Sequence, residues 1–165
     1  MSEREIMEYD VIVVGAGPAG LSCAIRLKQK KPDLMIAVIE KGSEVGAHIL
    51  SGAVIEPGPL DELLPGWKDN PPPVCIPVEG DEIWLLSQTG RRRLPTPPQQ
   101  KNHGNYIVSL GAMCAWMAEQ AEALEIDIFP GYAASDIRYT EDGAVGGVII
   151  GDMGVGSDGQ PKDTY

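Results

Sequence analysis

The spacing of the apolar residues changes twice near the start of the chain. Residues 10–15 (DVIVVG) form a short β-branched apolar run, which predicts a strand buried on both faces of a parallel sheet. From Pro18 the apolar positions follow helical spacing, and the lysines that precede Pro32 are typical of a last helical turn. Residues 34–40 (LMIAVIE) predict a second buried strand. This order of strand, helix and strand predicts a right-handed βαβ unit.

Prolines dominate the middle of the chain. The stretch PLDELLPGW predicts one short helix that begins at Pro59 and stops at Pro65 and Gly66. Residues 74–78 and 82–87 predict strand-like pieces, followed by a turn at 88–91 and a return limited by prolines. We therefore expect residues 66–101 to form a proline-rich hairpin insertion.

A second long helix is predicted after this region. Ser109 is a suitable N-cap, and the apolar positions from there to about Leu124 have the spacing of a buried helical stripe. Residues 126–130, 132–139 and 144–150 then predict strands, with the turn TEDG between the last two. We expect these strands to form a small antiparallel meander beside the parallel unit.

The turn after the first strand carries a dinucleotide-binding pattern. Gly15, Gly17 and Gly20 give G-x-G-x-x-G between a strand and a helix, and Glu40 ends the next strand. Gly15 permits the tight turn, Gly17 lets a pyrophosphate approach the backbone, and Gly20 lets the helix pack closely on the sheet. The Glu40 carboxylate suits both ribose hydroxyls and would repel a 2′-phosphate, which disfavours NADP.

A second glycine-rich stretch, EKGSEVGAHILSGAVIEP, follows at residues 40–57. Bare backbone at Gly46 and Gly52 would admit an extended FAD as it passes from its ribose toward its ring system. This favours FAD over NAD, although an ordinary turn also explains Gly46.

Composition and charge narrow the function further. The 165 residues fit about one domain, and 13 Lys and Arg against 24 Asp and Glu give a net charge of -11, which argues against nucleic acid as a partner. Cys23, Cys75 and Cys114 lie far apart, so no disulfide framework and no metal site is expected. The first residues resemble neither a signal peptide nor a transit peptide. The polar, glycine-rich end indicates the front piece of a longer chain.

Several segments resemble the electron transfer flavoprotein-ubiquinone oxidoreductases. The matching segments are DVIVVGAGPAGLSCAIRLKQ, IEKGSEVGAHILSGAVIEPG, NHGNYIVSLG, WMAEQAEAL and PGYAAS. The first fits many flavoproteins, whereas the second and third are more specific. The resemblance implies an α/β fold, a Rossmann-like FAD-binding domain of the glutathione-reductase type, with residues 1–165 as its incomplete N-terminal part. It assigns FAD binding to Gly15, Gly17, Pro18, Ala19, Gly20, Glu40, Lys41, Gly46, Ala47, His48, Ser51 and Gly52.

The resemblance also implies an activity. Family members take electrons from reduced electron transfer flavoprotein and pass them through FAD and a 4Fe-4S cluster to ubiquinone. We expect the cluster ligands and much of the quinone site beyond Tyr165, and the 165-residue piece alone to be inactive. No residue here is expected to be catalytic, and an orienting or packing role is favoured for His48.

The resemblance further implies peripheral attachment to the cytoplasmic face of the inner (cell) membrane. Apolar residues 83–86 would meet lipid, and arginines 91–93 would meet anionic head groups. Three alternatives stay open: a solvated turn in place of the membrane segment, another FAD-dependent reductase or hydroxylase, and a nucleotide-binding fragment without catalysis.

Overall fold

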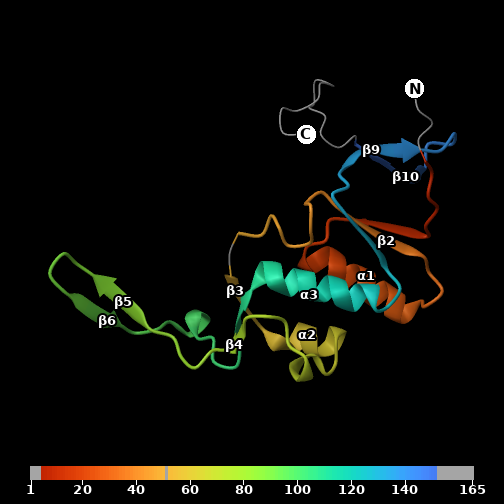
Figure 1. Cartoon of the computed structure of the whole chain (residues 1–165). Coiled ribbons are helices and arrows are strands. Elements are labelled where there is room, and N and C mark those ends of the chain that lie inside the picture. The colour runs from red at the N-terminus through yellow and green to blue at the C-terminus, as the bar shows by residue number, and fades with distance from the viewer. Residues whose placement is uncertain (1–4, 51, 152–165) are drawn as a thin grey trace. The chain divides into compact units, whose positions relative to one another are not determined.

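The computed structural model describes residues 5–50 and 52–151. The chain divides into two compact units, the first made of Met1–Leu50 with Cys114–Tyr165 and the second of Ser51–Met113. Figure 1 shows the elements of both units coloured in chain order.

The first unit is built on a three-stranded parallel sheet. Its strands are β1 (Val11–Val14), β2 (Ile36–Glu40) and β8 (Asp127–Pro130), in the order β1-β2-β8. Strand β2 lies in the centre, and Ile36, Ala37, Val38 and Ile39 are all buried. Helix α1 (Pro18–Lys30) joins β1 to β2 and buries Leu21, Ala24 and Ile25. The predicted βαβ unit is therefore confirmed.

Two predictions about this sheet were wrong. Within residues 5–50 and 52–151, β1 pairs with a strand on one side only, so three of its residues are half-buried and Val14 is 59% exposed. Strand β8 joins the parallel sheet instead of a meander, because α3 (Leu110–Glu122) precedes it and supplies the crossover that a parallel strand needs. The remaining strands, β9 (Ala134–Tyr139) and β10 (Val145–Ile150), form an antiparallel pair around the predicted turn.

Helix α3 follows the prediction closely. The Oγ of Ser109 lies 3.5 Å from the backbone nitrogen of Ala112, at the position of an N-cap contact. The apolar stripe of α3 is buried, and Cys114, Met117 and Ala121 are at most 1% exposed.

The second unit contains two small antiparallel sheets. In one, β7 (Tyr106–Ser109) lies between β3 (Gly52–Ile55) and β4 (Cys75–Pro77). In the other, β5 (Ile83–Leu86) pairs with β6 (Arg91–Leu94) as a hairpin. The hairpin and its turn were expected, whereas β3 and β7 were not.

Helix α2 (Pro57–Leu63) begins two residues earlier than predicted, because Pro57 also fits the first helical position. Two short 3-10 turns, η1 (Trp67–Asp69) and η2 (Pro98–Gln100), complete the unit.

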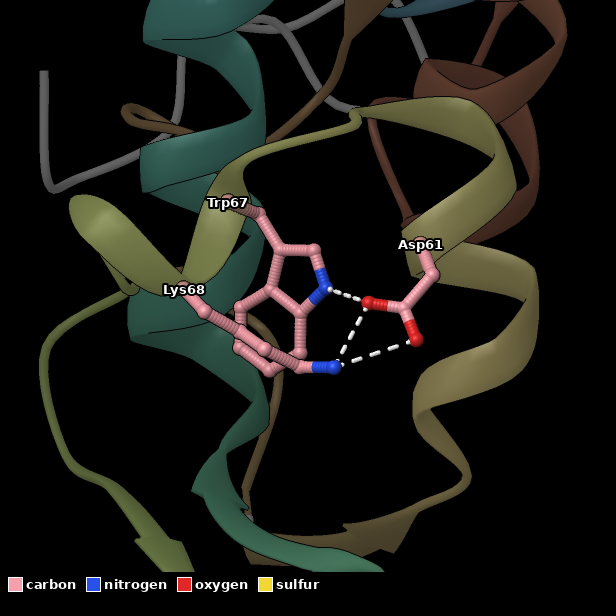
Figure 2. A network of polar contacts seen from close by, with 3 residues as sticks. All are labelled: Asp61, Trp67 and Lys68. Carbon is pink, nitrogen blue, oxygen red and sulfur yellow. Dashed lines mark hydrogen bonds and ion pairs between the residues drawn. The ribbon is translucent and has the colours of Figure 1, made fainter.

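A polar network ties α2 to η1 (Figure 2). The Asp61 carboxylate accepts a 2.7 Å hydrogen bond from the indole nitrogen of Trp67 and lies 2.9 Å from the Lys68 ammonium nitrogen. Trp67 is only 4% exposed, so this bond satisfies a buried donor, and its ring packs edge-on against Tyr106 at 5.2 Å between centroids. Hydrogen bonds from Lys68 and then Trp67 lower the pKa of Asp61. These contacts within the second unit therefore explain the three residues as structural ones.

Candidate functional site

The turn between β1 and α1 exposes the start of a helix. Gly15 has a φ of 103°, in the region that favours glycine, and its N–H donates a 2.7 Å hydrogen bond to the carbonyl of Ile39. Gly17 occupies the N-cap position of α1 without a side-chain cap, and the first turn holds no acidic residue. Because the first amide groups of a helix lack intrahelical acceptors and carry partial positive charge, this end suits an anion.

Gly17 and Gly20 lack side chains for different reasons. A Cβ built on Gly20 would lie 2.0 Å from the carbonyl oxygen of Gly15, so the approach of α1 to the turn requires glycine. A Cβ built on Gly17 would have no heavy atom within 4 Å. Packing therefore explains Gly20 but not Gly17, which leaves space beside the exposed helix start.

Glu40 connects the end of β2 to this turn. One carboxylate oxygen accepts a 2.9 Å hydrogen bond from the N–H of Ala16, and the other accepts a 2.7 Å bond from the N–H of Gly42. A carboxylate oxygen has two lone pairs, so each oxygen can accept a further bond. The carboxylate is thus held in one place beside the glycine turn, and its ribose contact stays a prediction.

The loop after Glu40 forms a turn. Gly46 has a φ of 90°, and the N–H of Ile49 donates a 3.0 Å hydrogen bond to its carbonyl. These observations give Gly46 the ordinary turn geometry that was the alternative to FAD contact. Lys41, Ala47 and His48 are exposed in this loop, and Ser51 lies outside the described residues.

Gly52 has its own structural explanation in the second unit. It begins β3, and a Cβ there would lie 2.9 Å from the carbonyl oxygen of Val108 on the neighbouring strand β7. The group close to this glycine is thus protein backbone, and its assignment to FAD stays a prediction.

Sequence reasoning missed two residues that hold the Glu40 carboxylate. Ala16 and Gly42 supply the two amides, and Gly42 is buried, with the Nδ1 of His48 3.5 Å from the point where its Cβ would lie. The Cys114 thiol has its pKa raised to about 11, mainly by burial and also by the negative charge of Glu40. The position of Gly42 two residues after Glu40 was the only available signal.

The described part of the chain holds no group of three or more His, Cys, Asp or Glu side chains placed to bind a metal ion. Within residues 5–50 and 52–151, no helix has the length and apolar character required to cross a membrane.

The sequence of the chain is similar to a family model and to known proteins. Residues 2–56 match the Thi4 family. The chain is 52% identical over 171 aligned residues to the electron transfer flavoprotein-ubiquinone oxidoreductase of Pseudomonas aeruginosa, with 99% of this chain and 31% of that protein covered. It is 51% identical to the mitochondrial protein of that name from Oryza sativa subsp. japonica, with 98% of this chain and 28% of that protein covered. The chain thus spans about a third of the length of these relatives.

Solved structures share the fold. A geranylgeranyl bacteriochlorophyll reductase-like protein from Thermoplasma acidophilum has a TM-score of 0.63 at 24% identity, with 86% of this chain and 34% of that chain covered. CtdE in complex with FAD has a TM-score of 0.55 at 25% identity, with 81% and 33% covered. The Rossmann-like fold of FAD-binding oxidoreductases is confirmed, and nearly the whole chain is homologous to part of the electron transfer flavoprotein-ubiquinone oxidoreductases.

Proposed function

We propose that this chain binds FAD at the turn between β1 and α1, as the N-terminal part of an oxidoreductase that passes electrons from reduced electron transfer flavoprotein to ubiquinone. The proposal is based on the similarity of nearly the whole chain to proteins named electron transfer flavoprotein-ubiquinone oxidoreductase.

The residues at the turn fit a dinucleotide. The space beside Gly17 and the exposed amides of the α1 N-terminus would hold the diphosphate, with Pro18, Ala19 and Gly20 as the first helical residues. Glu40 would hold the ribose of the adenosine, and the amides of Ala16 and Gly42 would keep its carboxylate oriented. When bound, FAD supplies a ring system that accepts and releases electrons. The chain's own part is to bind and orient this group.

The residues of this chain do not fit an iron-sulfur cluster. A 4Fe-4S cluster needs four cysteine thiolates, and the sequence has only the three separate cysteines, with Cys114 buried and its thiol protonated at neutral pH. We propose that any cluster ligands belong to the part of the relatives that this chain does not span.

Membrane attachment is the second part of the proposal. The hairpin of β5 and β6 exposes 39% of Trp84, 59% of Leu85 and 73% of Leu86, beside three exposed arginines on β6. Exposed apolar residues next to cations suit a membrane surface with anionic lipids. We propose that this hairpin attaches the complete protein peripherally to the cytoplasmic face of the cell membrane.

Spectroscopy of the purified full-length protein tests this function. We expect a flavin absorption band at about 450 nm that bleaches with reduced electron transfer flavoprotein and recovers when a ubiquinone analogue is added. A flavin that bleaches only with NADPH and a small substrate would identify a reductase or hydroxylase of the same fold instead. If the purified protein contains no flavin, only the interpretation as a nucleotide-binding fragment without catalysis is left.

A further inference from the structure

The strand register divides the side chains of the β5–β6 hairpin between two faces. Trp84 pairs with Arg93, and Leu86 pairs with Arg91. Residues that lie directly opposite one another in an antiparallel pair point to the same face, and residues two apart on a strand share a face. Trp84, Leu86, Arg91 and Arg93 therefore share one face, which we call the tryptophan face. The opposite face carries Ile83, Leu85, Arg92 and Leu94.

Glu82 binds two polar groups of the tryptophan face. One carboxylate oxygen accepts a 2.9 Å hydrogen bond from the indole nitrogen of Trp84, and the other lies 3.1 Å from a guanidinium nitrogen of Arg93. The guanidinium carbon of Arg91 lies 4.8 Å from the centroid of the Trp84 ring. Glu82 thus binds both the indole N–H of Trp84 and the guanidinium of Arg93, two groups that would otherwise be available to a lipid head group.

The polar turn disfavours insertion of the hairpin tip into lipid. Residues 87–90 (SQTG) form this turn, which is closed by a 2.9 Å hydrogen bond from the N–H of Ser87 to the carbonyl of Gly90. Entry by the tip would bury these polar groups in hydrocarbon, which is costly. A flat orientation leaves the turn at the interface, places Trp84 where tryptophan is favoured, and lets the arginines reach phosphate.

We propose that the tryptophan face lies flat on an anionic phospholipid surface and that Glu82 opposes this binding. The pair between Glu82 and Arg93 is exposed, with side-chain exposures of 51% and 60%, and exposed ion pairs are weak. Lipid phosphates can therefore replace Glu82 at Arg93, while the negative charge of Glu82 remains unfavourable beside the same phosphates. The inference rests on the proposed membrane attachment and adds the face, the lipid charge and the opposing residue.

Vesicle sedimentation of the full-length protein tests the role of Glu82. The vesicles contain phosphatidylcholine alone or phosphatidylcholine mixed equally with phosphatidylglycerol. Glu82→Gln should strengthen binding to the anionic vesicles about five-fold, the effect of one charge near such a surface. Glu79→Gln makes the same charge change at an exposed position before the hairpin, so its effect should stay below about two-fold. Equal effects of the two variants would contradict the role of Glu82.

A matched leucine pair tests the face. Leu86→Gln on the tryptophan face should weaken binding to the anionic vesicles by more than Leu85→Gln on the opposite face, and FAD content should be unchanged in both. An equal or larger effect of Leu85→Gln would overturn the face assignment while leaving membrane attachment intact. If the unmodified protein sediments with neither vesicle, both the attachment and this inference are wrong, whereas FAD binding is unaffected.

Discussion

The backbone N–H of Ala16 donates a 2.9 Å hydrogen bond to the Glu40 carboxylate, which links the glycine turn after β1 to the end of β2. The second carboxylate oxygen is held by Gly42 at 2.7 Å. Glu40 therefore fixes the shape of the turn, and in our proposal it also binds the ribose.

Replacing Glu40 should separate these two roles. Glu40→Ala removes two charge-assisted hydrogen bonds and the ribose contact, so FAD affinity should fall by at least about ten-fold. In competition against FAD, the unmodified protein should favour ADP over 2′-deoxy-ADP, and the variant should lose this preference. Glu56→Ala, at an exposed position before α2, serves as the control. An unchanged preference in Glu40→Ala would contradict the ribose contact.

Gly20 should tolerate no side chain. In Gly20→Ala the new Cβ would lie 2.0 Å from the Gly15 carbonyl oxygen, so α1 and the turn must shift. We expect a loss of about 1–3 kcal/mol in the free energy of unfolding, measured by urea denaturation. Gly58→Ala adds the same group in α2 with no heavy atom within 4 Å, and it should be neutral or stabilising. Equal stability of the two variants would show that α1 does not approach the turn closely at Gly20.

Cys114 predicts a pH dependence of stability. Its pKa is about 11 in the folded chain, against 9.0 as the ordinary value, because the thiol is buried and lies near the charge of Glu40. The folded chain keeps this proton between pH 9 and 11 while the unfolded chain releases it, so the stabilisation is complete below pH 9 and is lost as the pH rises. The free energy of unfolding of the unmodified protein, relative to Cys114→Val, should fall by about 1.4 kcal/mol per pH unit in this range. If the difference in the free energy of unfolding between the two proteins does not change with pH, the raised pKa of Cys114 is wrong.

Local spacing was sufficient to predict the parallel unit. The apolar run before Gly15, the helical spacing after Pro18 and the run ending at Glu40 give β1, α1 and β2 nearly residue for residue. The stripe of α3 was equally clear, because 3.6-residue spacing over a long segment is a strong signal.

Long-range pairing explains what the sequence did not show. Strands β3 and β7 are short and separated by more than 50 residues, so neither has a local pattern that indicates the other. The same holds for β8, whose parallel partner β2 lies far back in the chain. Gly52 illustrates the effect on the site, because only the pairing with β7 reveals why a side chain is excluded there. The two amides around Glu40 were missed because almost any residue can supply a backbone donor, and only the position of Gly42 close to Glu40 gave a signal.

The most direct test concerns Gly17. A Cβ at this position meets no heavy atom within 4 Å, and its φ of -77° suits any residue, so Gly17→Val should fold with a nearly unchanged thermal midpoint. Its branched side chain would occupy the space that we assign to the diphosphate. The measurement is the flavin stoichiometry of the purified full-length variant, from its absorption at about 450 nm. We expect a folded protein without FAD, whereas a folded variant with the same FAD content as the unmodified protein would show that the diphosphate does not lie beside Gly17.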